Sequence, residues 1–328
     1  MTPAAATAEQ LETRRRLRAV KVAIGVSVLV CAVEITLGWM LELQSLIAEG
    51  IHTLLDGVDS VIVLISVIVA ARPADRSHPF GHGKFEALGA AVEGSFVLVA
   101  AIGIGFRAVD RLVRHEAPDS IPLFVCGVMI AAAVFYLFVS MYLMRVARET
   151  SSPAVLAEAL HLRTHIFITA GVAGGLLLGS LARWPIADTF LALGIAVCLV
   201  GISVHIFREV LKQFMDEALP SEEIERLADI IARYSDRFVE VHGLRTRQSG
   251  AERHIAMHLV VLPQTTVSAA HGLSHEIEDA ITTEWPAARV TVHVEPVNTD
   301  HTEYRQWIRG QPKVRTGDDP LDQREFMH

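Results

Sequence analysis

The chain has 328 residues, of which 51% are hydrophobic and 20% are charged, and its mean hydropathy is +0.38. Soluble proteins usually carry about 25% charged residues, so this composition disfavours a purely soluble enzyme and excludes a disordered or collagen-like chain. A formal net charge of −8 argues against a nucleic-acid partner, because such partners require a basic surface. Fifteen histidines accompany three cysteines without a C-x-x-C pair, which excludes a disulfide scaffold and a thiolate zinc site.

The region before residue 217 contains long apolar stretches. A bilayer core of about 30 Å requires about 20 apolar residues per helix, and six stretches meet this requirement. They are Val22–Leu41, Ile47–Ala71, Phe85–Val109, Leu123–Met144, Ala154–Ala182 and Ile186–Phe207. We therefore expect an N-terminal arm over residues 1–21 and a six-helix transmembrane domain over residues 22–217.

The loops between these stretches differ in their positive charge. Ten Lys and Arg residues fall in the N-terminal arm and in the second-to-third and fourth-to-fifth connections, whereas four fall in the opposite loops. Cytoplasmic loops carry the excess of Lys and Arg. The sequence therefore predicts that both termini are cytoplasmic, and the compact loops favour a bacterial inner membrane.

From residue 218 the chain resembles a water-soluble domain. Pro220-Ser221-Glu222-Glu223 predicts a helix start with Ser221 as the capping residue, followed by apolar residues at helical spacing. Alternating apolar residues predict three strands, and a longer apolar pattern predicts a second helix. The strands are Glu240–Gln248, Arg253–Leu262 and Arg289–Val294, and the helix is Val267–Trp285. This order predicts a small α+β domain over residues 218–297. Residues 298–328 are polar and aperiodic, which is typical of a disordered tail.

Ionisable residues recur at helical spacing inside two apolar stretches. The second stretch carries His52, Asp56 and Asp59, and the fifth carries Glu158, His161 and His165. Residues three and four apart share one helix face, so His52/Asp56 and His161/His165 can surround one ion, and imidazole with carboxylate suits a zinc-like cation. We interpret Glu49, Asp59 and Glu158 as groups that face water or support the direct ligands. Glu34, Glu86 and Glu93 are candidates for lining the same aqueous cavity, although the sequence indicates no partner for them.

Two further groups of metal-ligating residues lie outside these stretches. Asp75, His78 and His82 stand within eight positions of the loop after the second stretch. In the C-terminal domain, histidines are concentrated within about 55 residues, a density that favours metal binding. The residues concentrated there are His242, His254, His258, His271, His275 and His293, together with Glu295.

In this order, these motifs resemble the cation diffusion facilitator family over most of residues 20–298. The motifs are Ala48-Glu-Gly-Ile-His-Thr-Leu-Leu-Asp56, His78-Pro-Phe-Gly-His-Gly-Lys-Phe-Glu86, Glu158-Ala-Leu-His-Leu-Arg-Thr-His165 and Phe214-Met-Asp-Glu-Ala-Leu-Pro220. The resemblance implies a homodimer in which each protomer has six transmembrane helices and a cytosolic ferredoxin-like domain. It also implies export of divalent metal from the cytoplasm in exchange for protons.

Carried over by position, the resemblance makes His52, Asp56, His161 and His165 the transport site. Asp75, His78 and His82 match a loop site. The resemblance also selects five cytosolic residues that match regulatory metal positions at the dimer interface, namely His242, His258, His271, His293 and Glu295.

Two positions depart from the family pattern. His165 stands where the family usually has Asp, which removes one negative charge and favours zinc over hard cations such as manganese. Co²⁺, Ni²⁺, Cd²⁺ and Fe²⁺ remain alternatives as the transported and regulatory ion. Glu295 stands where close relatives have Asp, which changes the reach of that carboxylate.

Two other classes of function remain open on the sequence. A membrane metal sensor or scaffold would bind ions without moving them. An intramembrane metallohydrolase is disfavoured, because the chain has no H-E-x-x-H helix and no evident general base beside an open coordination position. The sequence therefore predicts a transporter rather than an enzyme.

Overall fold

A computed structural model of the chain describes residues 3–114, 123–181, 187–297 and 313–314. The chain divides into two compact units, one covering residues 12–214 and the other combining the residues up to Leu11 with the C-terminal region from Met215.

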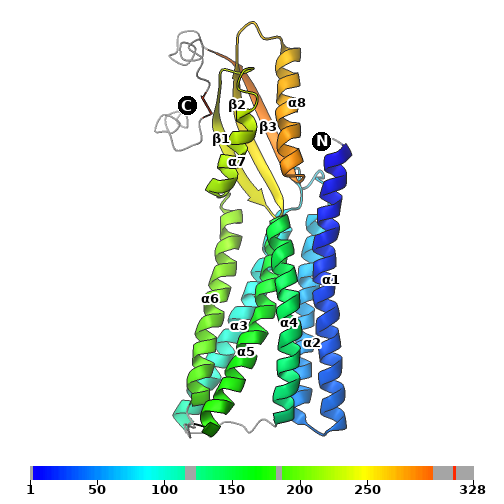
Figure 1. Ribbon diagram of the computed structural model, residues 1–328, viewed down its shortest axis with the longest axis vertical. Coiled ribbons are helices and arrows are strands. Elements are labelled where there is room, and N and C mark those ends of the chain that lie inside the picture. Colours follow the sequence, from blue (N-terminus) through cyan, green and yellow to red (C-terminus); the bar gives the residue numbers. More distant parts are fainter. Residues whose placement is uncertain (1–2, 115–122, 182–186, 298–312, 315–328) are drawn as a thin grey trace. The chain divides into compact units, whose positions relative to one another are not determined.

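The larger unit contains six long helices within the described ranges (Figure 1). They are α1 (Pro3–Met40), α2 (Gln44–Ala70), α3 (Lys84–Arg114), α4 (Leu123–Thr150), α5 (Pro153–Leu181) and α6 (Ala187–Phe214). Each apolar stretch of the sequence coincides with one helix to within a residue or extends into a longer one. The expected N-terminal arm is helical from Pro3 and forms the first part of α1, so no break separates it from the first apolar stretch.

Five of the described helices are long and apolar enough to cross a membrane, namely α1, α2, α3, α4 and α6. α5 carries Glu158, His161, Arg163 and His165 in its first half, and the side chains after Gly171 lie outside the described residues. Membrane crossing by α5 therefore stays a prediction. Large apolar side chains lie on the outside of the unit, including Phe106 at 73% exposure and Phe138 at 66%. An outer surface of this kind fits a lipid solvent rather than water.

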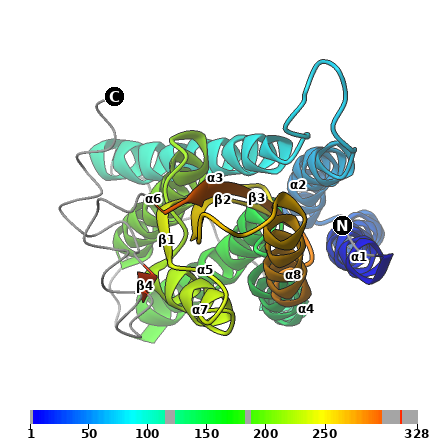
Figure 2. The same cartoon turned by 90° about the horizontal axis from the view of Figure 1, so that it is seen from above.

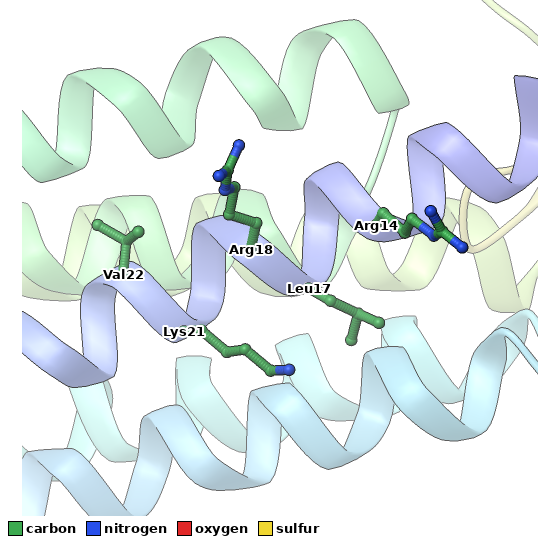
Figure 3. Close-up of a pocket in the computed structure, with 5 residues that line it drawn as sticks. All are labelled: Arg14, Leu17, Arg18, Lys21 and Val22. Carbon is green, nitrogen blue, oxygen red and sulfur yellow. The ribbon is translucent and has the colours of Figure 1, made fainter.

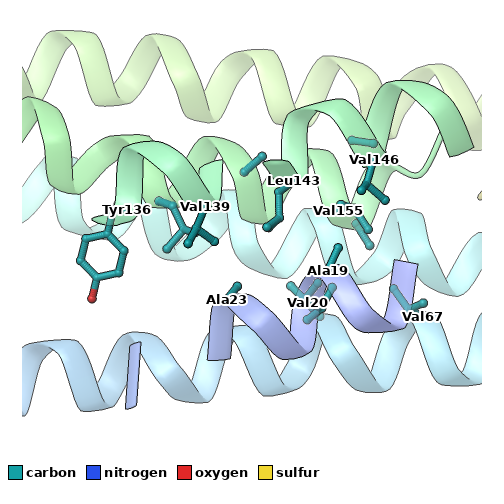
Figure 4. Close-up of a cluster of buried hydrophobic side chains, with 14 of the residues drawn as sticks. Ala19, Val20, Ala23, Val67, Tyr136, Val139, Leu143, Val146 and Val155 are labelled. Atoms are coloured by element: carbon teal, nitrogen blue, oxygen red, sulfur yellow. The ribbon is translucent and has the colours of Figure 1, made fainter. Parts of the chain in front are cut away.

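A cluster of buried apolar side chains holds α1, α2, α4 and α5 together (Figure 4). Val20, Val67, Leu143 and Val155 are all 0% exposed in this cluster. On α1 the cluster also contains Ala19 and Ala23, and small residues allow helices in a membrane to approach closely.

Glycine permits a second close approach, between α2 and α3. A Cβ atom at Gly89 would lie 2.2 Å from Oγ of Ser66, so no larger residue fits without a shift of one helix. The start of α5 is capped by a side chain. Ser152 accepts a hydrogen bond from the N–H of Val155, and Pro153 occupies the first position of the helix. A capping hydroxyl followed by proline is a favoured helix start.

The C-terminal unit is an α/β domain. Its described elements are α7 (Ser221–Ala232), β1 (Glu240–Ser249), β2 (Glu252–Val261), α8 (Val267–Glu284), β3 (Ala288–Pro296) and β4 (Lys313–Val314). The strands form one sheet in the order β3-β2-β1-β4, with β1 and β2 antiparallel and the other two pairs parallel. Both helices lie on the same side of the sheet (Figure 2).

The strand pattern separates a core face from a polar face. Ile255, Met257 and Leu259 of β2 are buried against Ile231 of α7 and Ile277 of α8. Because side chains alternate along a strand, the intervening residues point to the face that the helices leave uncovered. His258 is one of them, and its register partners are His242 on β1 and His293 on β3.

The predicted helices and strands of this domain are present with ends shifted by at most two residues, but the predicted capping role of Ser221 is wrong. Ser221 is the first helical residue, and the flanking Pro220 forms no side-chain cap. The backbone oxygen of Pro220 instead accepts hydrogen bonds from the N–H groups of Glu223 and Ile224. Of the expected tail, only Lys313 and Val314 are described, and the other residues from 298 to 328 lie outside the described ranges.

Candidate metal sites

Three of the four predicted transport ligands meet in the interior of the helical unit. One ligand atom each of Asp56, His161 and His165 lies within 4.8 Å of the others. Oδ2 of Asp56 lies 3.4 Å from Nε2 of His165 and 3.7 Å from Nε2 of His52. The side chain of His52 is 48% exposed and stands beside this group of three rather than within it.

The same interior contains acidic side chains that the sequence left without partners. Oε1 of Glu93 on α3 lies 2.7 Å from Nδ1 of His161 on α5. Asp59, Glu93 and His161 form a second buried group whose ligand atoms lie within 4.8 Å of one another. Ser60 donates a hydrogen bond to Oε1 of Glu158 at 2.7 Å. Asp59 and Glu158 therefore lie in the protein interior rather than in water, at 5% and 0% exposure.

The other intramembrane acids have structural partners. Thr53 donates a hydrogen bond to Oε2 of Glu34 at 2.8 Å, and Arg16 forms an ion pair with Glu86. Glu34 and Glu86 are therefore each paired with a side chain of a neighbouring helix, and neither belongs to the group formed by Glu93. The side chain of Glu49 lies outside the described residues.

Sequence reasoning also missed an aromatic neighbour of the transport ligands. The ring of Tyr136 on α4 stacks on the imidazole of His165, with centroids 4.7 Å apart. Tyr136 lies in the uncharged fourth stretch, where nothing in the sequence marks it. Its stacking restricts the orientation of the His165 ring.

The predicted loop residues lie together in the connection between α2 and α3. Asp75, His78 and His82 place ligand atoms within 4.8 Å of one another. Oδ1 of Asp75 accepts hydrogen bonds from the hydroxyl and N–H of Ser77 and from the N–H of His78. These bonds, led by that of the Ser77 hydroxyl, lower the pKa of Asp75 to about 2. The carboxylate is therefore charged, as metal coordination requires.

The cytosolic residues gather on the face of the sheet that no helix covers. His242, His258 and Glu295 place ligand atoms within 4.8 Å of one another. Nδ1 of His258 lies 2.7 Å from Oε1 of Glu295, and Nε2 of His293 lies 3.4 Å from the same oxygen. Three adjacent strands thus supply three imidazoles around one carboxylate.

His271 is not part of this cytosolic group within one chain. It lies on α8, on the covered side of the sheet, and its Nε2 lies 3.1 Å from Nε2 of His275. The concentration of histidines in the sequence could not separate the two faces, because that depends on which side of the sheet the helices pack.

A pocket on the surface of α1 is unrelated to these groups. Arg14, Leu17, Arg18, Lys21 and Val22 line it, and Figure 3 shows them all on the same helix. None of the predicted ligands contributes to its lining.

Comparison with known proteins identifies relatives along nearly the whole described chain. The cation efflux transmembrane domain family matches residues 20–215, and the cytoplasmic domain of cation efflux proteins matches residues 219–297. The chain is 34% identical over 258 residues to the uncharacterized transporter sll1263 of Synechocystis sp., covering 76% of this chain and 83% of that protein. It is 31% identical over 281 residues to the cation-efflux pump FieF of Cronobacter sakazakii, covering 85% of this chain and 92% of the pump.

A solved structure of the putative zinc transporter CzrB in its zinc form is 41% identical to this chain. The match covers 26% of this chain and 98% of that one, with a TM-score of 0.25. The family matches extend over both units, and the described helices of the first unit suit a membrane. The chain is therefore a multi-pass membrane protein of the cation efflux, or cation diffusion facilitator, family, whose members are transporters rather than enzymes.

Proposed function

We propose that the protein exports divalent transition-metal cations, with zinc as the preferred ion, from the cytoplasm in exchange for protons. The observation that carries the proposal is the buried group of Asp56, His161 and His165, which lies on two helices of this chain. The chain belongs to a family of cation efflux proteins. Two imidazoles and one carboxylate form a ligand set that suits zinc and its neighbours Co²⁺, Ni²⁺, Cd²⁺ and Fe²⁺. His52, in contact with Asp56, is the fourth ligand once its ring turns inward.

The chemistry of these ligands suits exchange with protons. Histidine binds metal only when its ring is neutral, and an ordinary imidazole titrates near neutral pH. With the site open to the cytoplasm, neutral rings and a charged Asp56 take up the ion. With the site open to the other side, protons displace the ion and return with the empty carrier, as alternating access requires.

We propose that six helices cross an inner membrane with both termini in the cytoplasm, in accord with the distribution of Lys and Arg. The helix–strand–strand–helix–strand order supports a ferredoxin-like cytosolic domain. Family membership supports a homodimer that is formed through this domain. In the dimer, the metal positions on the face of the sheet that no helix covers are regulatory, and His271 contributes to them from α8.

Metal flux into proteoliposomes tests the proposal. Asp56→Ala and His161→Ala should abolish zinc accumulation and the coupled proton flux, because each removes a buried ligand. His205→Ala is the matched control, since His205 lies on α6 outside the groups described above, and it should transport like the wild type. Zinc binding without accumulation in the wild type would instead identify a sensor. Undiminished flux in both ligand variants would reject the assigned site.

A further inference from the structure

His161 belongs to two groups of potential ligands at once. One group joins it to Asp56 and His165, and the other joins it to Asp59 and Glu93. In each group the ligand atoms lie within 4.8 Å of one another, which is the spacing of groups that share one ion. The second group draws on three helices, because Asp59 lies on α2, Glu93 on α3 and His161 on α5.

The second group is enclosed by protein. Asp59, Glu93 and His161 are 5%, 1% and 6% exposed. Nε2 of His161 is buried and has no hydrogen-bond partner among the described residues. Nδ1 of His161 and Oε1 of Glu93 are 2.7 Å apart but are not aligned as a hydrogen bond, so both atoms also remain unsatisfied. Buried polar atoms without partners are costly, and a bound cation satisfies them.

The charges of the group also favour a bound cation. Asp59 and Glu93 bring two carboxylates into a space where, among the described residues, no lysine or arginine forms an ion pair with either. The neighbouring Glu158 adds a third, whose Oε2 is buried without a hydrogen-bond partner. Uncompensated carboxylates are strongly disfavoured inside a membrane protein, and such residues mark ion pathways.

We propose that Asp59, Glu93 and His161 form a second binding position for the transported divalent cation. This proposal rests on the proposed function of the neighbouring transport site. Along α2, Asp59 lies about one turn nearer than Asp56 to the helix end that leads into the loop of residues 71–83. We place that end at the cytoplasm, so the second position receives the ion first and passes it to Asp56 and His165.

The shared imidazole couples the two positions. A neutral imidazole offers a lone pair on only one of its two nitrogens, and two divalent cations so close together would repel each other strongly in a site of low dielectric constant. One ion therefore occupies either position, and His161 stays a ligand while Asp59 and Glu93 are exchanged for Asp56 and His165. The acids lower the cost of bringing a hydrated dication to the buried imidazoles.

Zinc binding by the purified full-length protein tests for the second position directly. The background carries Asp75→Ala and His258→Ala, which disable the loop and cytosolic groups. Adding Asp56→Asn with His165→Ala should leave one zinc per chain in equilibrium dialysis, bound about 10- to 100-fold more weakly than in the background. Zinc X-ray absorption should then show a single imidazole ligand. Further addition of Asp59→Asn and Glu93→Gln should eliminate this binding.

Zinc flux measures the role of the second position in transport. Asp59→Asn with Glu93→Gln, in the otherwise wild-type protein, should raise the cytoplasmic-side KM for zinc at least tenfold. Glu34→Gln is the matched control, because Glu34 is a buried carboxylate that accepts a hydrogen bond from Thr53 outside both groups. It should change KM less than twofold.

The two proposals fail in different ways. If Asp56→Ala is inactive but Asp59→Asn with Glu93→Gln keeps the wild-type KM, the transport site stands and the second position is rejected. Loss of all zinc binding on removal of Asp56 and His165, in a protein that still elutes as a folded species, also rejects the second position. Undiminished flux in Asp56→Ala rejects the proposed transport site itself.

Discussion

Arg16 of α1 and Glu86 of α3 form an ion pair inside the helical unit, with side chains only 7% and 0% exposed. The other carboxylate oxygen of Glu86 accepts a hydrogen bond from Ser152, the residue before α5. One buried carboxylate therefore connects α1, α3 and the start of the helix that carries His161 and His165.

Loss of this carboxylate should destabilise the protein. Glu86→Ala leaves Arg16 buried without its partner, which typically costs about 3–5 kcal/mol. Unfolding of the purified protein in detergent, followed by circular dichroism, measures the change. Glu149→Ala is the control, because Glu149 pairs with the exposed Arg145, and exposed pairs contribute at most about 1 kcal/mol. Equal losses in the two variants would contradict the structural role of Glu86.

Replacement of His165 by Asp should change the preferred metal. The substitution adds a negative charge and an oxygen ligand to the group formed with Asp56 and His161. Hard cations prefer oxygen ligands, so Mn²⁺ should compete with zinc at least tenfold better in His165→Asp than in the wild type. Metal competition on the purified proteins gives this ratio, and an unchanged ratio would show that His165 does not set selectivity.

Gly243 should be required for the cytosolic ligand group. It lies in β1 directly after His242, with a positive φ of 59°, at an irregularity in the pairing with β2. A residue with a Cβ atom in this conformation costs about 1–2 kcal/mol, so Gly243→Ala should shift His242 and weaken cytosolic zinc binding. Gly272→Ala on α8 is the control, since its Cβ meets no atom within 4 Å. Calorimetric zinc titration of both variants, with the transport and loop ligands removed, provides the comparison.

The pKa of the loop carboxylate Asp75 should depend on the hydroxyl of Ser77. The pKa of Asp75 is lowered to about 2, first by the Ser77 hydroxyl, so Ser77→Ala should move it up towards the ordinary value. A lowered carboxyl pKa in the folded state contributes stability that is complete above the unfolded pKa of about 3.9 and is lost as the pH falls towards 2. The variant should lose this contribution at a higher pH. Carboxyl NMR titration of aspartate-labelled protein, with Asp75→Asn for assignment, measures the shift, and an unchanged pKa would exclude the hydroxyl as its cause.

The cytosolic histidines should control regulation rather than transport itself. His258→Ala with His293→Ala removes two imidazoles from the open sheet face and leaves the group around Asp56 intact. The zinc concentration for half-maximal flux should rise severalfold, while the maximal flux stays near that of the wild type. Flux measured across a range of zinc concentrations separates these quantities. Loss of maximal flux would place the two residues in the transport path.

Local patterns in the sequence determined much of this protein. The length of the apolar stretches predicted the long helices, and alternation along the chain predicted β1, β2 and β3. Spacings of three and four placed His161 and His165 on one helix face, and the family motifs identified the chain as a cation efflux protein. These inferences depend on the length, the period and the order of residues along the chain, which the sequence alone specifies.

The relations between elements were decided by the tertiary structure. The pairing of Glu93 with His161 depends on the rotation of α3 and α5 about their axes and on their relative register. Close packing fixes both, as at Gly89, where the missing Cβ allows α3 to approach α2. The side of the sheet on which α8 packs likewise separates His271 from His258. A sequence specifies which residues share a face, but only packing specifies which faces meet, and the shared position of His161 between two ligand groups is a consequence of that packing.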